Sequence, residues 1–152
     1  MSSQGRNDQD RDERRIVVGV DGSPSSTAAL RWAIRHAKLT GCVVEAVTAW
    51  HIPTGYGFAP VVDDAVDWAG DAGKVLFETL NEVAGVDPDV MIRPVVQEGQ
   101  AAEVLVQAAR GADLLVVGCR GHGGFARTLL GSVSQQCVHH APCPVLVMRD
   151  GA

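Results

Sequence analysis

The sequence has no long apolar run. No stretch of its 152 residues approaches the roughly 18 uncharged apolar residues that a membrane span requires. It also begins without the apolar segment of a secretory signal, because the first fifteen residues are almost all polar. These absences favour a soluble protein that is not exported. They predict a disordered polar tail over residues 1–14, followed by one folded domain over residues 15–150.

Cysteine is scarce and never occurs as C-x-x-C. The thiols are therefore expected to be reduced, in a cytoplasmic protein; they are Cys42, Cys119, Cys137 and Cys143. Residues 137–143 read CVHHAPC, which superficially suggests a metal site. Adjacent histidines on a helix point about 100° apart, however, and Cys137 belongs to the apolar face. We therefore expect packing here and no metal.

Motifs of common enzyme classes are absent as well. There is no G-x4-G-K-[ST] loop, which would set a lysine against phosphates, and no G-x-S-x-G elbow of a hydrolase. After the first predicted strand the chain reads GVDGSPS, where a dinucleotide fingerprint needs G-x-G-x-x-G. A formal net charge of -5 argues against binding the backbone of DNA or RNA, which relies on clustered Lys and Arg. We expect no enzyme and no nucleic-acid partner.

What is present is a regular alternation of strands and helices. Aliphatic and β-branched runs predict strands over residues 15–20, 42–50, 90–97, 113–117 and 144–148. Helical apolar spacing predicts helices over residues 24–40, 65–84, 101–110 and 132–140. Such alternation implies parallel pairing with right-handed crossovers. The predicted fold class is α/β, a doubly wound five-stranded parallel sheet of the Rossmann-like type.

A glycine-rich loop follows the fourth predicted strand. Gly118, Gly121 and Gly131 stand in the pattern G-x2-G-x9-G, with Ser132 directly after them. Without a Cβ, such a loop lets backbone N–H groups converge on an oxyanion and enters left-handed conformations readily. The loop is therefore a candidate phosphate cradle. The alternative interpretation is a flexible connection without a ligand.

The residues after this loop predict the start of a helix. Ser132 and Gln135 fit a capping box with Ser132 as the N-cap. The N-terminus of that helix would offer uncommitted N–H groups and the positive end of its dipole to a phosphate. The surrounding segment is also favourable to anions, since no acidic residue occurs between Asp113 and Asp150. In open α/β sheets, ligands bind beyond the carboxyl ends of the strands, where the topology switches.

These features together resemble the universal stress protein family. They are G-x2-G-x9-G-S after the fourth strand, an Asp-Gly-Ser turn after the first and a final PCPVLV strand, covering about residues 15–148. The resemblance is to the nucleotide-binding branch, which has an adenine-nucleotide α-hydrolase-like fold. It implies the strand order 3-2-1-4-5, with the switch point between strands one and four. It further implies an adenine nucleotide ligand, either ATP with magnesium or another such as AMP or cyclic AMP.

The resemblance also assigns site residues by position. Ribose and phosphates would be held mainly by backbone N–H groups and the Ser132 hydroxyl, within the set Gly118, Gly121, Gly131, Ser132 and Val133. Asp21 and the backbone of Val47 would meet the adenine. Asp followed by Gly is also ordinary turn chemistry, so a structural role for Asp21 stays open.

The implied function is a regulatory ATP-binding protein in a bacterial stress or dormancy response. Any ATP hydrolysis would be slow and incidental. The strand at Val145–Met148 would lie at an edge of the sheet, where pairing across a two-fold axis would cover it and form a homodimer. Two alternatives stay open: a dimeric interaction protein without nucleotide, and a slow ATPase.

Overall fold

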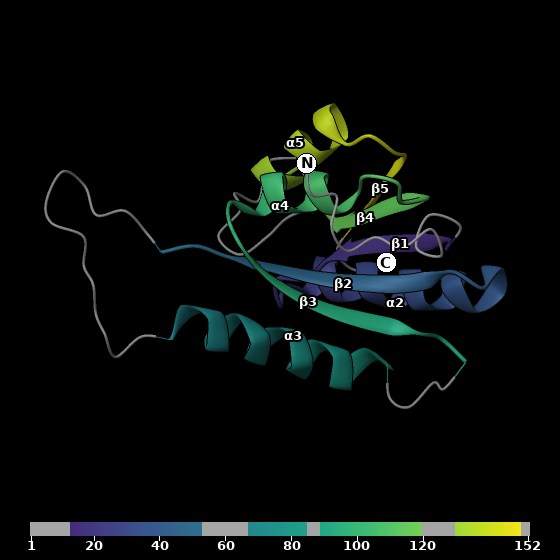
Figure 1. Ribbon diagram of the computed structural model, residues 1–152, viewed down its shortest axis with the longest axis horizontal. Coiled ribbons are helices and arrows are strands. Elements are labelled where there is room, and N and C mark those ends of the chain that lie inside the picture. Colours follow the sequence, from purple (N-terminus) through teal and green to yellow (C-terminus); the bar gives the residue numbers. More distant parts are fainter. Residues whose placement is uncertain (1–12, 53–66, 85–88, 120–129, 150–152) are drawn as a thin grey trace, which may run out of the picture.

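The domain is built on one five-stranded parallel sheet. The computed structural model describes residues 13–52, 67–84, 89–119 and 130–149. The elements of these ranges are β1 (Arg15–Gly19), α2 (Pro24–Thr40), β2 (Val43–Trp50), α3 (Trp68–Ala84), β3 (Ile92–Glu98), α4 (Ala101–Ala108), β4 (Leu114–Gly118), α5 (Ser132–His140) and β5 (Val145–Met148) (Figure 1). The strand order is β3-β2-β1-β4-β5 with every neighbouring pair parallel. The predicted fold class and strand order are confirmed.

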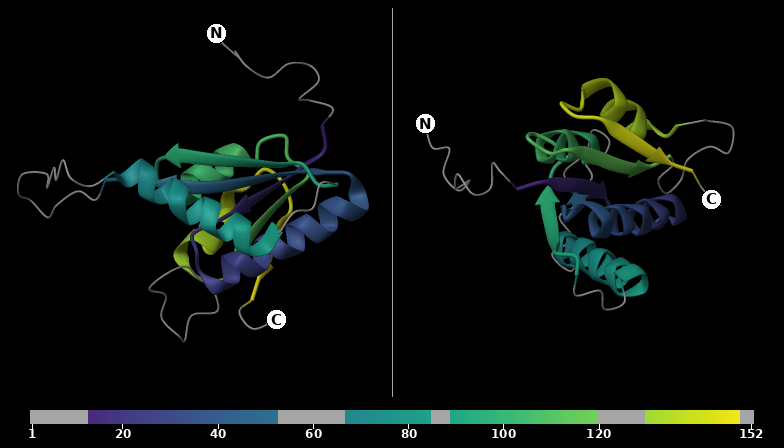
Figure 2. Two further views of the ribbon diagram at one scale, coloured as in Figure 1. Left: turned by 90° about the horizontal axis from the view of Figure 1, so that it is seen from below. Right: turned by 90° about the vertical axis from the view of Figure 1, so that its right-hand side faces the viewer.

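Helices cover both faces of the sheet. Figure 2 shows α2 and α3 on one face and α4 and α5 on the other. Successive residues of β1 serve opposite layers, since Ile16 and Val18 pack with the α2 side while Val17 packs with the α4 side. All three are at most 1% exposed, as expected of a central strand buried on both faces.

Helix α2 begins and ends on the residues that predict it. Ser23 is the N-cap, its Oγ accepts a hydrogen bond from the Ser26 N–H, and Pro24 occupies the first helical position. The helix stops at Gly41, whose φ of 78° is in the left-handed region that favours glycine. The next helix, α3, begins at Trp68, three residues later than predicted, because Asp67 precedes it in a non-helical conformation and its Oδ1 accepts from the Gly70 N–H.

The sheet contacts begin at Glu13, inside the predicted polar tail. The Arg14 carbonyl accepts from the Val43 N–H at 2.8 Å, which extends the pairing of β1 with β2 by one residue. The Glu13 carboxylate lies 2.8 Å from the guanidinium of Arg93 on β3. Residues 1–12 of the predicted tail lie outside the described ranges.

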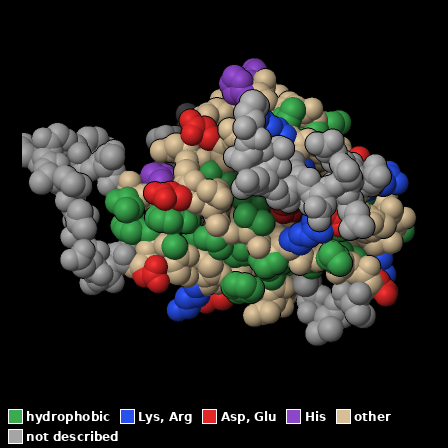
Figure 3. All heavy atoms as spheres, viewed as in Figure 1, with side chains coloured by type: hydrophobic (Ala, Val, Ile, Leu, Met, Phe, Trp, Pro, Cys, Tyr) green, Lys and Arg blue, Asp and Glu red, His purple; other side chains and the backbone are tan. Residues whose placement is uncertain are grey.

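The two edges of the sheet differ in character. Edge strand β3 is largely polar and contains Pro94, which has no N–H to donate. Edge strand β5 reads VLVM and all four of its residues are half-buried. Apolar side chains also gather at the surface over α3 and β3 (Figure 3), where Phe77 is 55% exposed and Met91 59% exposed. In the part of the chain described by the structure, no helix is both long and apolar enough to span a membrane.

Candidate functional site

The candidate site lies where the chain direction switches. β1 is flanked by β2 on one side and β4 on the other, so the connections that leave β1 and β4 run to opposite faces of the sheet. The carboxyl ends of these strands lie at one edge, the usual place for a ligand in a doubly wound sheet. Gly19 at the end of β1 is level with Val47 of β2, and Gly118 at the end of β4 is level with Met148.

Gly118 is required by packing against α2. A Cβ added there would lie 2.7 Å from the Ser26 backbone nitrogen and 2.8 Å from the Ser25 carbonyl carbon, and it would also overlap the Ser25 Oγ. No such approach is possible for a residue with a side chain. The φ of Gly118 is not positive, so close approach and not a left-handed conformation explains this glycine. Gly121 lies outside the described residues.

The start of α5 differs from the predicted capping box. Gly131, in an extended conformation at φ -71° and ψ 169°, is the N-cap, and Ser132 is the first helical residue. The Gln135 side chain donates to the Leu130 carbonyl at 3.3 Å instead of serving the cap. The prediction was wrong by one position because the Gly131 carbonyl already accepts the first helical bond, from the Gln135 N–H at 3.0 Å. Any residue can adopt this backbone conformation.

Only part of the predicted set of N–H donors is available to a ligand. The Gly131 N–H donates to the Cys119 carbonyl at 2.6 Å, which anchors the start of α5 to the end of β4. Ser132 and Val133, at the first two helical positions, have no carbonyl four residues back within the helix. Ser132 is exposed, and the Val133 side chain is 36% exposed. Their N–H groups and the Ser132 hydroxyl therefore form an anion-binding helix N-terminus at the switch point.

Asp21 organises the turn between β1 and α2. Its Oδ1 accepts from the Ser23 N–H at 2.9 Å, an Asx turn that leads directly into the N-cap. The Asp21 N–H donates to the Ser26 hydroxyl at 3.3 Å. The carboxylate is exposed at the carboxyl edge, so the structural role left open by the sequence is present in the structure.

Val47 is committed to the sheet, and the residue two positions further is better placed. The Val47 carbonyl accepts from the Val20 N–H at 2.8 Å, and the residue is 1% exposed. Ala49 turns its peptide groups to the same side of β2, because successive residues of a parallel strand alternate between neighbours. There β1 has already ended, and the Val20 carbonyl accepts from the Thr48 hydroxyl at 2.9 Å. Sequence reasoning missed Ala49 because the length by which β2 outruns β1 is set by the tertiary structure.

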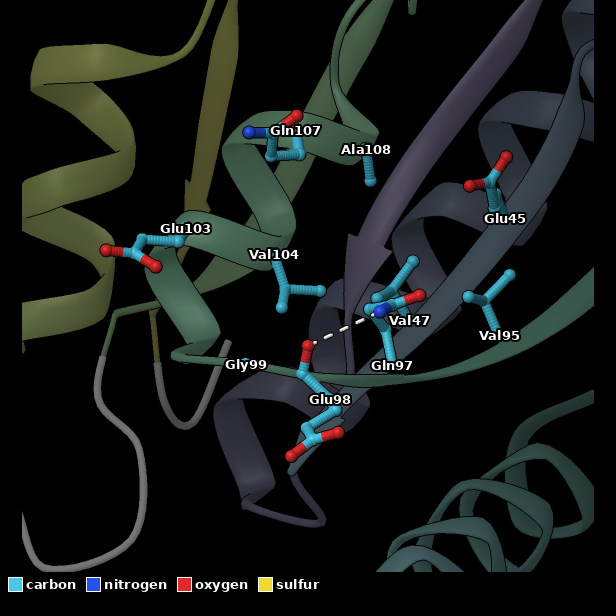
Figure 4. Close-up of a pocket in the computed structure, with 10 residues that line it drawn as sticks. All are labelled: Glu45, Val47, Val95, Gln97, Glu98, Gly99, Glu103, Val104, Gln107 and Ala108. Atoms are coloured by element: carbon cyan, nitrogen blue, oxygen red, sulfur yellow. Dashed lines mark hydrogen bonds between the residues drawn. The ribbon is translucent and has the colours of Figure 1, made fainter. Parts of the chain in front are cut away.

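A groove of about 470 Å³ adjoins this edge between the sheet and α4. Figure 4 shows Val104 of α4 and Val47 of β2 facing each other across its apolar centre. The lining residues are Glu45, Val47, Val95, Gln97, Glu98, Gly99, Glu103, Val104, Gln107 and Ala108. Three carboxylates and two carboxamides, but no Lys or Arg, surround the apolar centre. Such a lining disfavours phosphate and suits an uncharged group that carries N–H donors.

The thiols near the site are packing groups. Cys137 is fully buried in the core beneath α5, and burial raises the pKa of its thiol to about 11. At neutral pH it is therefore a protonated, unreactive thiol. His139 and His140 are both exposed on the last turn of α5, away from that buried sulfur. Among the residues that the structure describes, no three His, Cys, Asp or Glu side chains are grouped to hold a metal ion.

The fold and the position of the candidate site define a doubly wound α/β protein with a helix N-terminus at its switch point. Residues 13–149 match the family model described as "Universal stress protein family", and the chain belongs to that family. A universal stress protein of Mycolicibacterium smegmatis is 35% identical over 145 residues, which cover 88% of this chain and 47% of that protein. Universal stress protein Rv2623 of Mycobacterium tuberculosis is 33% identical, over 89% of this chain and 47% of its own length. The chain thus spans about half the length of these curated relatives.

Solved structures agree with this assignment. Universal stress protein UspA from Lactobacillus plantarum superposes with a TM-score of 0.76 at 24% identity, over 90% of this chain and 97% of that one, and supports the fold. A universal stress protein in complex with cAMP superposes with a TM-score of 0.64 at 31% identity. That match covers 89% of this chain and 96% of the other.

Proposed function

We propose that this chain binds an adenine nucleotide, ATP with magnesium in the first place, at the carboxyl edge between β1 and β4. The observation that carries the proposal is the start of α5, where Ser132 and Val133 offer helix N–H groups at the switch point of a doubly wound sheet. A relative of known structure, 31% identical, is in complex with cAMP, which supports an adenine nucleotide as the ligand.

The two ends of the nucleotide would occupy chemically different places. The phosphates would lie at the N-terminus of α5, held by Ser132 and Val133 with the loop glycines Gly118, Gly121 and Gly131 shaping the cradle. The base would lie toward the end of β2, beside Asp21 and Val47, with the Ala49 backbone as a further contact. The groove supports this orientation, because its carboxylates repel phosphate while its oxygen acceptors complement an exocyclic amino group.

The proposed output is regulation and not turnover. We infer a cytoplasmic bacterial protein whose nucleotide state alters its own conformation or a partner surface during stress or dormancy. It would act as a homodimer through Val145–Met148. Any hydrolysis of ATP would be slow, and a turnover assay with a Ser132 variant as control measures it.

The direct test identifies the ligand and then removes one donor at a time. Purified protein is denatured and any released nucleotide is identified by mass, and ATP is titrated calorimetrically into nucleotide-free protein. Ser132→Pro removes the N–H and the hydroxyl at a helix position that tolerates proline, whereas Ser132→Ala removes the hydroxyl alone. We expect Ser132→Pro to weaken ATP binding by about 1.5–3 kcal/mol, as for a lost hydrogen bond to a charged group, and Ser132→Ala by less.

The outcomes separate the proposal from its alternatives. Equal affinity of the parent and a folded Ser132→Pro variant would contradict the α5 cradle. A parent that releases no nucleotide and binds none would favour the dimeric interaction protein without nucleotide.

A further inference from the structure

The amino half of α4 is held by close contact with two glycines. A Cβ on Gly19, the last residue of β1, would come within 2.9 Å of the Leu105 side chain. A Cβ on Gly99, just before the helix, would come equally close to Val104. These approaches seat α4 on the carboxyl edge of the sheet, where it forms one wall of the groove beside the proposed base site.

The carboxyl end of α4 is held by a buried arginine at the other end of β1. Arg15 is 5% exposed. Its guanidinium donates to the Ala108 carbonyl at 2.7 Å and to the Arg110 carbonyl, and it lies 3.4 Å from the Glu45 carboxylate. The Arg15 backbone N–H donates to Asp113 at 2.9 Å. The cation thus satisfies carbonyls at the end of the helix and complements its negative dipole end.

Other restraints on α4 are few. The helix has eight residues, a length that is marginal without tertiary contacts. Gln100 at its N-cap makes no capping hydrogen bond with its side chain, and the C-cap residue Ala109 is not in the left-handed conformation of a glycine cap. Arg15 is the polar group that ties the wall of the groove, through Ala108, to its floor, through Glu45.

We propose that Arg15 is a positioning residue for the nucleotide base: it fixes the width of the groove between α4 and β2 without contacting the phosphates. Four residues of extended chain, about 13 Å, separate it from the carboxyl end of β1. Its effect therefore travels through α4. This inference rests on the proposed function, because it assigns a role in binding that same nucleotide.

The test compares ligands with and without a base. ATP is titrated by calorimetry, and tripolyphosphate is measured as a competitor of ATP. Arg15→Met keeps the length of the side chain but removes its charge and donors. We expect it to weaken ATP binding about tenfold and to leave tripolyphosphate affinity unchanged, because the phosphates lie at α5. Arg15→Lys keeps the charge without the planar fork and gives an intermediate result.

Arg93→Met is the matched control. Arg93 is also a sheet arginine in an ion pair, but its partner is Glu13 and its side chain is 40% exposed, so we expect ATP and tripolyphosphate affinities equal to those of the parent. Because Arg15→Met leaves Glu45 without its partner, the double variant Arg15→Met/Glu45→Gln is measured beside it. All titrations are made well below the melting temperature of each variant.

Each outcome has a defined meaning. A folded Arg15→Met or double variant that binds ATP like the parent overturns the positioning role alone. A parallel loss of ATP and tripolyphosphate affinity also overturns it, since that result marks general damage to the edge. A parent that binds neither ligand overturns the proposed function itself. If both methionine variants fail to fold, Arg15→Lys decides by the same comparison.

Discussion

At the scale of single residues, glycines of one motif serve different physical purposes. Gly118 is small because α2 approaches β4 closely, and Gly131 stands at the N-cap in a conformation open to any residue. Asp21 closes a turn while it faces the candidate site. A pattern that belongs to ligand binding is therefore partly a packing pattern, and substitutions at its members should separate stability from affinity.

A pair of glycine substitutions tests this distinction. Gly118→Ala should lower the free energy of unfolding by about 1–3 kcal/mol, because its Cβ meets the backbone of α2. Gly73→Ala, within α3, meets only Val96 at an ordinary 3.9 Å and should raise stability by about 0.5–1 kcal/mol. Urea denaturation followed by circular dichroism measures both. Equal stability of the Gly118→Ala variant and the parent would contradict the packing explanation.

At the scale of elements, the two helices that begin near the switch point are capped differently. The first turn of α2 is satisfied internally, since Ser23 accepts from Ser26 and the Thr27 hydroxyl donates to the Ser23 carbonyl. The N-cap of α5 is Gly131, which has no side chain to accept from the first helical N–H groups. A helix start without a side-chain cap is the one with donors to offer, which is why the proposed phosphate position lies at α5.

The start of β1 gives a prediction at this scale. Deleting residues 1–12 should leave the free energy of unfolding unchanged, because that polar segment has no apolar face to dock. Deleting residues 1–14 also removes the Glu13–Arg93 pair and the bond from Val43 to Arg14, and should cost about 0.5–1.5 kcal/mol. Thermal and urea unfolding of both truncated proteins measure the difference. A destabilised 1–12 deletion would show that those residues contribute to the fold.

At the scale of the whole molecule, the two sheet edges suggest how copies would associate. Pro94 and charged neighbours protect β3 from pairing, whereas β5 presents half-buried apolar residues to both faces. The chain also spans about half the length of its curated relatives. A second copy paired along β5 would cover the unprotected edge.

Substitution on the two edges tests that assembly. Val147→Lys places a charge on β5 and should convert the proposed dimer to monomer or aggregate, as measured by size-exclusion chromatography with light scattering. Val96→Lys places the same charge on β3, where the side chain is already 37% exposed, and should leave the dimer intact. A dimer that persists in Val147→Lys would place the interface elsewhere.

The sequence by itself determined the class of fold, the order of elements and the position of α2 from Ser23 to Gly41, because these follow from local spacing, caps and apolar runs. It also predicted the bounds of α5 and the edge positions of β3 and β5. Only the tertiary structure decided what depends on neighbours distant in sequence. Gly118 meets Ser25 and Ser26, the Gly131 N–H is taken by Cys119, and β2 outruns β1 as far as Trp50. Such contacts arise when separate segments pack against each other, and no local pattern encodes the distance between them.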